Sequence, residues 1–261
     1  MITRNATVVM SAPIQARLHR HLFPGDGLEA AALLLCRRAG RRRVKLLSFD
    51  LIEVPYEACQ REVDRLTWPG AFVEAAIRRA DTENLVVIAV HSHPSGALAF
   101  SPLDDLIDSS LMPAIFEGTD RMCGSAIMVR SGERRVRLYF DGKAPVAVDL
   151  VLQPDEDFVL SWHDGTALPM AFTSGMTNCL GRLSACVIGV SGTGSIVAEQ
   201  LARLGLGEVI LIDFDRVEFK NLNRILNSTL ADAKSETLKV EAFGAVVRRY
   251  RQGCQVVEIP R

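Results

Sequence analysis

The stretch His91-Ser-His-Pro-Ser-Gly-Ala-Leu-Ala-Phe-Ser-Pro-Leu-Asp104 decides how the rest of the chain is interpreted. It follows an apolar run at residues 85–90, which predicts a buried strand. His91 and His93 are alternate residues at the end of that strand, so we expect their imidazole rings to leave on the same face.

Residues 101–104 predict the start of a helix. Ser101 is a favourable N-cap residue and Pro102 a favourable first helical residue, which places Asp104 in the first turn. Two imidazoles from a strand end and one carboxylate from a helix start can converge on one point. Three such ligands, with a fourth position left to water, are the pattern of a catalytic zinc site.

A His-x-His pair by itself usually means two exposed or hydrogen-bonded imidazoles. Here the chain has only five histidines, and two of them lie in this stretch ahead of a capped aspartate. We therefore interpret His91, His93 and Asp104 as metal ligands.

The spacing His-Ser-His, seven residues, then Ser-x-x-Asp resembles the signature of the JAMM (JAB/MPN) zinc metalloproteases. That family removes ubiquitin-like proteins from conjugates or trims their C-termini. Its motif also has a glutamate upstream, and Glu29 matches that place. Glu53, Glu57 and Glu62 also lie upstream, but they fall in or after the second arm of a predicted hairpin and rank below Glu29.

The resemblance implies a zinc ion held by His91, His93 and Asp104, with Glu29 as the general acid–base. Ser101 is implied to stabilise the oxyanion of the tetrahedral intermediate. Helix capping is an equally good explanation of Ser101, and both roles can hold together.

Length and composition favour a soluble chain of two domains. The chain has 261 residues and a net charge of −1, so charge alone gives no argument for a nucleic-acid or membrane partner. The six cysteines form no Cys-x-x-Cys pair, and the sequence shows neither a signal peptide nor a run long enough to span a membrane. The default expectation is a reducing, cytoplasmic location.

Hydrophobic patterning predicts a mixed α/β sandwich for residues 1–152, and the resemblance to the JAMM fold covers roughly residues 5–150. Residues 153–171 are polar and irregular and are interpreted as a linker. The expected strands are 6–10, 30–36, 44–54, 85–90, 124–129, 136–140 and 146–152, and the expected helices are 13–23, 69–79 and 102–116.

Residues 172–261 predict a partial Rossmann-like domain. A strand at 185–190 leads into the glycine-rich turn Gly189-x-Ser-Gly-x-Gly-Ser195, followed by a helix at 196–204 and a second strand at 208–212. The free N–H groups of such a turn favour phosphate oxygens. A third strand is expected at 255–259.

The runs Asp213–Glu218, Asn221–Arg224 and Lys239–Glu241 resemble the ATP-binding segment of the ThiF/MoeB and ubiquitin-activating-enzyme family. The resemblance implies phosphate contacts from Gly189, Gly192, Gly194, Asn221, Arg224 and Lys239, and a ribose contact from Asp213.

The chain departs from that family in three places. Ser191 stands where the family usually has glycine, and no arginine is clearly placed ahead of the first strand, because Arg182 is too close to it. The chain also reaches Arg261 before the family's magnesium-binding aspartate. We expect weak ATP binding without adenylation, in either a piece of a longer fusion or a remnant domain. The uncovered sheet edge favours truncation or a homo-oligomeric contact.

The sequence predicts a zinc-dependent (iso)peptidase that processes a ubiquitin-like protein at its C-terminus. Its expected partners are that protein or its conjugates and the cognate activating and conjugating enzymes, in bacterial ubiquitin-like conjugation and phage defence. One alternative is an ATP-dependent adenylating activator of a ubiquitin-like or sulfur-carrier protein. A second is a non-catalytic ubiquitin-like-binding scaffold, and a third, within the hydrolases, is a RadC-like JAB protein.

Overall fold

The computed structural model describes residues 6–40, 43–154, 159–163 and 174–261. The chain divides into two compact units, Met1–Thr166 and Ala167–Arg261, and each is described by itself. The division falls inside the stretch interpreted as a linker from the sequence. No helix in the described part of the chain is long and apolar enough to cross a membrane.

The first unit is built on a nine-stranded mixed sheet with the order β11-β10-β1-β3-β2-β6-β7-β8-β9. Parallel pairs join β1 to β3 and β10 and join β6 to β7, and the remaining pairs are antiparallel. The strands are β1 (Ala6–Val9), β2 (Ala31–Ala39), β3 (Val44–Glu53), β6 (Val86–His93), β7 (Cys123–Val129), β8 (Arg134–Tyr139), β9 (Pro145–Ala147), β10 (Leu150–Gln153) and β11 (Val159–Trp162).

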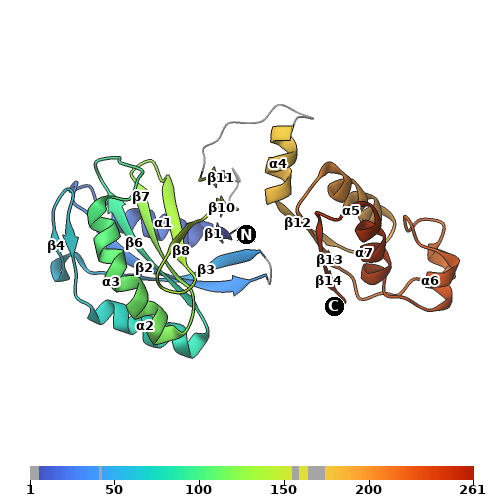
Figure 1. Ribbon diagram of the computed structural model, residues 1–261, viewed down its shortest axis with the longest axis horizontal. Coiled ribbons are helices and arrows are strands. Elements are labelled where there is room, and N and C mark those ends of the chain that lie inside the picture. Colours follow the sequence, from blue (N-terminus) through green and yellow to red (C-terminus); the bar gives the residue numbers. More distant parts are fainter. Residues whose placement is uncertain (1–5, 41–42, 155–158, 164–173) are drawn as a thin grey trace. The chain divides into compact units, whose positions relative to one another are not determined.

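Helices cover both faces of this sheet (Figure 1). Helix α1 (Ala12–Leu22) packs on one face, and α2 (Ala71–Glu83) and α3 (Pro102–Thr119) pack side by side on the other. Alternate residues of the central strands therefore enter different cores: Leu34 lies on the α1 side, whereas Leu33 and Leu35 lie on the side of α2 and α3. This arrangement confirms the predicted mixed α/β class.

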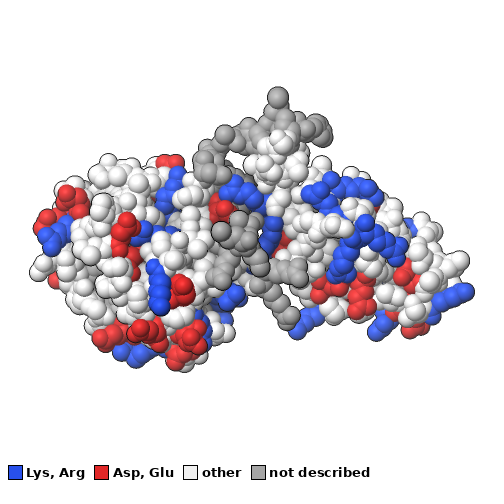
Figure 2. All heavy atoms as spheres, in the orientation of Figure 1, with Lys and Arg blue, Asp and Glu red and all other residues white. Residues whose placement is uncertain are grey.

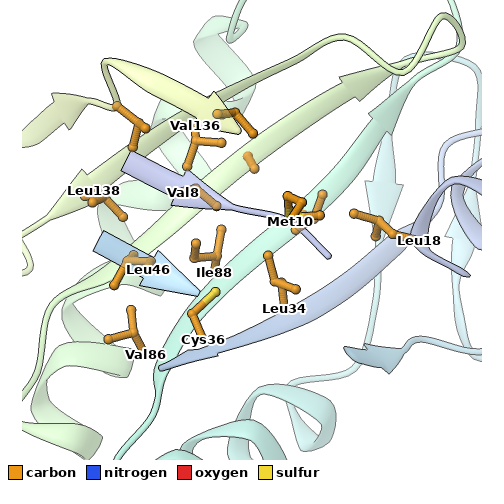
Figure 3. Close-up of a cluster of buried hydrophobic side chains, with 14 of the residues drawn as sticks. Val8, Met10, Leu18, Leu34, Cys36, Leu46, Val86, Ile88, Val136 and Leu138 are labelled. Atoms are coloured by element: carbon orange, nitrogen blue, oxygen red, sulfur yellow. The ribbon is translucent and has the colours of Figure 1, made fainter. Parts of the chain in front are cut away.

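The core on the α1 side is enclosed by curvature of the sheet (Figure 3). Val136 of β8 and Val8 of β1 belong to this one cluster although several strands separate them in the sheet order. The Val148 N–H donates to the Val136 carbonyl at 2.9 Å, which draws the two ends of the sheet together. Fully burying one such aliphatic side chain contributes about 1.5–3 kcal/mol.

Three elements of the first unit differ from the sequence expectation. The strand expected at 146–152 is divided into β9 and β10, because the Val148 N–H turns toward β8. Residues 159–162, inside the predicted linker, form β11, which pairs antiparallel with β10. A two-stranded ribbon of β4 (Gln60–Arg61) and β5 (Leu66–Thr67) also forms, which was not predicted.

The surface of the first unit carries both signs of charge. On the face shown in Figure 2, acidic and basic side chains lie interspersed over this unit. This pattern agrees with the net charge of −1 for the whole chain.

The second unit contains a parallel three-stranded sheet in the order β12-β13-β14, as predicted. Its elements are α4 (Ser174–Arg182), β12 (Ser184–Ile188), α5 (Gly192–Leu204), β13 (Glu208–Ile212), the 3-10 turn η2 (Phe219–Asn221), α6 (Leu230–Lys234), α7 (Lys239–Tyr250) and β14 (Gln255–Ile259). Apolar residues of α5 and α7 pack on one sheet face with Val187, Val209 and Leu211.

Helix α5 begins at Gly192 rather than at the predicted residue 196, so the glycine turn supplies the first helical turn. Glycine is a poor helix former, which is why propensity places the start too late. Only glycine fits at position 194, because a Cβ there would lie 1.7 Å from the Gly189 carbonyl oxygen.

Candidate metal centre

The two histidines are the last residues of β6 to face the side of the sheet covered by α3. His91 pairs with Ala31 of β2 and His93 with Val129 of β7, so both backbones are fixed by the sheet. The intervening Ser92 is buried, and its hydroxyl oxygen accepts a hydrogen bond from the Ala30 N–H at 2.9 Å. The alternation expected from the sequence therefore brings the two imidazoles together.

The carboxylate of Asp104 is oriented by the start of α3. Its Oδ2 accepts from the Ser101 N–H at 2.6 Å, and the Ser101 Oγ accepts from the Asp104 N–H at 3.2 Å. This reciprocal pair is a capping box with Pro102 at the first helical position. The N-terminal end of the helix also favours negative charge on Asp104.

The side-chain atoms of His91, His93 and Asp104 meet at one place. The distance from His91 Nε2 to His93 Nε2 is 3.0 Å, from His91 Nε2 to Asp104 Oδ1 3.0 Å and from His93 Nε2 to Asp104 Oδ2 3.5 Å. Tetrahedral ligands at about 2.1 Å from one ion are separated from each other by about 3.4 Å. The observed set is close to that spacing, and in the described part of the chain these three residues form a group that could hold a metal ion.

The tautomer of His93 suits a ligand. Its Nδ1 lies 2.8 Å from the Ala97 carbonyl oxygen, which can only accept, so Nδ1 carries the proton in the neutral ring. The Nε2 atom is then an open lone pair directed at His91 and Asp104. Two imidazole nitrogens and one carboxylate oxygen are a donor set that fits zinc.

The electrostatics keep Asp104 ionised. Burial opposes ionisation, but hydrogen bonds from His91 and His93 hold the pKa of Asp104 far below its usual range. The same contact with Asp104 raises the pKa of His93, against the effect of burial. The cluster therefore favours a shared positive charge at its centre, supplied by protons or by a metal ion.

Glu29 reaches the same pocket from the segment before β2. A cavity of about 170 Å³ is lined by Glu29, Ser101 and the three ligand residues. Glu29 is 7% exposed, and burial raises the pKa of its carboxyl group, although the neighbouring His91 and His93 lower it in part. Its backbone is fixed by Arg61, whose Nε donates to the Glu29 carbonyl at 2.7 Å.

The other upstream glutamates, all in the described part of the chain, do not line this cavity. Glu53 instead pairs with Arg17 at 2.8 Å, and Glu57 and Glu62 are exposed. The structure thus places Glu29, and not its three competitors, beside the ligand group.

Sequence reasoning missed a second polar group at this cavity, Asp108 and Ser125. Asp108 Oδ2 accepts from Arg137 Nε at 2.9 Å, from the Tyr139 hydroxyl at 2.9 Å and from the Ser125 hydroxyl. Arg137 also pairs with Asp105 and stacks on Phe100, with its guanidinium carbon 3.8 Å from the ring centroid. The sequence signal was the spacing of Asp104 and Asp108, one turn apart on α3.

In the second unit, the structure brings part of the predicted nucleotide site together. Asp213 is buried beside the glycine turn, where Oδ2 accepts from the Val190 N–H at 2.7 Å and Oδ1 from the Asp215 N–H at 2.9 Å. The Arg224 stem lies about 3.5 Å from the position that a Cβ on Gly192 would occupy.

Two other predicted phosphate contacts are engaged elsewhere. Lys239 is buried, and its Nζ lies 2.6 Å from Asp215 Oδ2. Asn221 is also buried, and its Oδ1 accepts from the Glu218 N–H at 3.1 Å within a local cap.

Comparisons with known proteins identify both parts of the chain. Residues 11–139 match the prokaryotic homologs of the JAB domain, and residues 167–261 match the ThiF family. The ubiquitin-like modifier-activating enzyme 5 of Dictyostelium discoideum is 39% identical over 60 residues, which are 23% of this chain and 16% of that protein. The tRNA threonylcarbamoyladenosine dehydratase of Bacillus subtilis is 37% identical over 73 residues, which are 28% of each.

Among solved structures, the E. coli tRNA N6-threonylcarbamoyladenosine dehydratase in complex with ATP is similar at 29% identity with a TM-score of 0.33. That match covers 34% of this chain and 36% of the other. The chain spans less than a third of the length of each of the curated relatives named above. The protein thus carries a prokaryotic-type JAB domain over residues 11–139 and a ThiF-family segment over residues 167–261.

Proposed function

We propose that the protein is a zinc-dependent (iso)peptidase that releases or trims a ubiquitin-like protein at its C-terminus. The observation that carries the proposal is the meeting of His91, His93 and Asp104 in one cavity with a buried carboxylate, Glu29. A JAB domain with this ligand group supports metallopeptidase chemistry. The ligand set would hold a zinc ion, which would polarise a peptide carbonyl and make a hydroxide nucleophile available near neutral pH.

Glu29 would move the proton. Its carboxylate lies in the ligand cavity, and burial raises its pKa toward the range in which a carboxylate can both accept and return a proton. It would take the proton of the attacking water and deliver it to the departing amine.

Ser101 would stabilise the oxyanion while it caps α3. The cap uses its oxygen as an acceptor from the Asp104 N–H. Its hydroxyl hydrogen has no acceptor among the described residues, and the side chain lines the cavity. The hydroxyl can therefore donate to a substrate oxygen without losing the cap.

The ubiquitin-like class of substrate is proposed from the ThiF segment. One relative is named a ubiquitin-like modifier-activating enzyme, and such an enzyme acts on the same class of protein that a JAB peptidase would release. The partners would be that protein or its conjugates, with the cognate activating and conjugating enzymes.

The test is cleavage of ubiquitin-like fusion proteins by the purified chain, with and without a chelator. We expect cleavage at the C-terminus of the ubiquitin-like part, loss with chelator and recovery with added zinc. Glu29→Gln should keep zinc and fold but slow cleavage by about two to four orders of magnitude. Glu57→Gln is the matched control, because Glu57 is exposed and outside the cavity. Near-normal cleavage by Glu29→Gln would assign the base to another residue, and Asp64, which also lines the cavity, would be tested next.

A further inference from the structure

The first unit has a second, larger cleft that shares no lining residue with the metal centre. Its volume is about 800 Å³. One wall is a stripe of α1 at helical spacing, the second is the turn between β7 and β8, and the third is formed by β10 and β11. Its lining residues include Gln15, His19, Arg20, Gly132, Glu133 and Arg134.

Arg134 is the unusual residue of this cleft. It is 5% exposed, and all of its hydrogen bonds are to neutral oxygens. Nε and Nη2 donate to the Gly132 carbonyl at 3.1 and 2.8 Å, and Nη1 donates to Gln15 Oε1. A guanidinium has five N–H donors, so these three bonds leave two donors without an acceptor among the described residues. In the described part of the chain, no carboxylate pairs with Arg134.

Other buried arginines of the first unit are paired with acids. Arg137, three residues further along β8 and 8% exposed, is held by Asp105 and Asp108. Arg61, whose side chain is 8% exposed, pairs with Asp26 at 2.8 Å. A buried cation without an anion is costly, because hydration is lost and no opposite charge replaces it. In agreement, burial lowers the pKa of Arg134 to about 10.

The other charged groups of the cleft leave it positive. Arg20 is exposed on the same wall of α1. His19 donates from Nε2 to the Arg130 carbonyl at 2.9 Å. Glu133 is the acidic lining residue; it is exposed, and its Oε2 accepts from the Ser131 hydroxyl at 2.9 Å instead of reaching Arg134.

We propose that this cleft binds a ligand through a carboxylate or phosphate group that contacts the Arg134 guanidinium. An oxyanion would occupy the open donors and supply the missing negative charge, as arginine does in buried ion pairs. The cleft is far larger than a single oxyanion and lies in the size range of small-molecule sites, so the oxyanion is borne by a larger molecule.

The experiment titrates inorganic phosphate and, separately, acetate into the full chain by isothermal calorimetry. The chain is stripped of metal and desalted, and ionic strength is held constant with sodium chloride. The Asp104→Asn variant is titrated as well, so that binding at the metal centre is recognised. We expect saturable binding of at least one of the two ions, with a Kd in the millimolar range, about −4 kcal/mol. The ion that binds identifies the head group as phosphate or carboxylate.

Arg134→Met should weaken that binding by about tenfold or more. The Kd of Arg134→Lys should lie between those of the wild type and Arg134→Met, because lysine keeps the charge but loses the planar fork. Arg20→Met is the matched control and should change the Kd by less than about threefold, since an exposed charge contributes little. Circular dichroism verifies that each variant is folded, and Arg134→Lys keeps the test valid where Arg134→Met does not fold. Absence of saturable binding of either ion would overturn the proposal. So would equal binding by wild type and the folded Arg134 variants, or loss of binding in Asp104→Asn.

Discussion

At the residue scale, Asp104 serves two purposes with one carboxylate. Its Oδ2 completes the helix cap and its Oδ1 lies against His91. The cap therefore orients the Asp104 carboxylate before any metal is present. The Nε2 atom of His93 points toward this carboxylate, because the Nδ1 atom of the same ring is hydrogen-bonded to the Ala97 carbonyl. Each ligand atom is oriented by a contact outside the cluster, which is the usual way in which metal ligands are preorganised.

This arrangement gives the first prediction, on zinc content. His91→Ala and Asp104→Ala should each lower bound zinc well below one ion per chain, because each removes one of three protein ligands. Atomic emission on the purified protein measures the content.

Ser101→Ala is the control for the cap. It removes the Oγ acceptor of the capping box but leaves the Asp104 carboxylate, so zinc should remain near one per chain while stability falls by about 1 kcal/mol. Full occupancy in both ligand variants would show that the ion is held elsewhere.

At the element scale, the position of α3 depends on β8. Arg137 joins Asp105 and Asp108 of this helix to the sheet and stacks on Phe100 in the loop that leads to Ser101. Asp108 lies one turn after Asp104, so the contact holds the helix end that carries Asp104.

The second prediction tests that connection. Arg137→Met leaves the buried Asp108 carboxylate without its cation and should lower the free energy of unfolding by about 3–5 kcal/mol. Zinc affinity should fall as well, because the start of α3 loses its support. Urea denaturation and a competitive zinc titration measure the two effects.

Arg134→Met is the matched control on the same strand, since Arg134 is as deeply buried but has no carboxylate partner among the described residues. Arg134→Met should lower the free energy of unfolding by much less than Arg137→Met does. Adding Asp108→Asn to Arg137→Met should recover part of the loss, because the unpaired charge is then removed. Equal losses in the two arginine variants would contradict the assigned role of the ion pair.

The elements also show what could be predicted from sequence. The period of two in β6 and the cap at Ser101 are local signals, and together they predicted that the side chains of His91, His93 and Asp104 meet. Asp108 is different, because its place depends on Arg137, 29 residues away. The position of Glu29 depends on Arg61, 32 residues away, so only a family resemblance could indicate it. Strand β11 was missed because its four residues become a strand only by pairing with β10.

At the scale of the whole molecule, the two units differ in whether the residues of their predicted sites are already paired with other protein groups. In the candidate metal cavity of the first unit, the potential ligand atoms of His91, His93 and Asp104 all lie within 4.8 Å of one another. In the second unit, both Asp213 oxygens accept backbone N–H groups, and Lys239 is paired with Asp215. Among the residues predicted to contact phosphate, Arg224 lies beside Gly192, and its side chain is not paired with a carboxylate of the described residues.

The last prediction follows from this difference. The 261-residue chain should bind ATP weakly and should not form an acyl-adenylate with a ubiquitin-like protein, because adenylation needs the α-phosphate aligned and its charge neutralised. A pocket in which Lys239 is already neutralised by Asp215 supplies little of that charge. Pyrophosphate exchange with candidate ubiquitin-like proteins measures the reaction. Asp215→Asn frees Lys239 and should tighten ATP binding, whereas Glu218→Gln, an exposed change, should not. Robust exchange by the unmodified chain would instead make ATP-dependent activation the leading function.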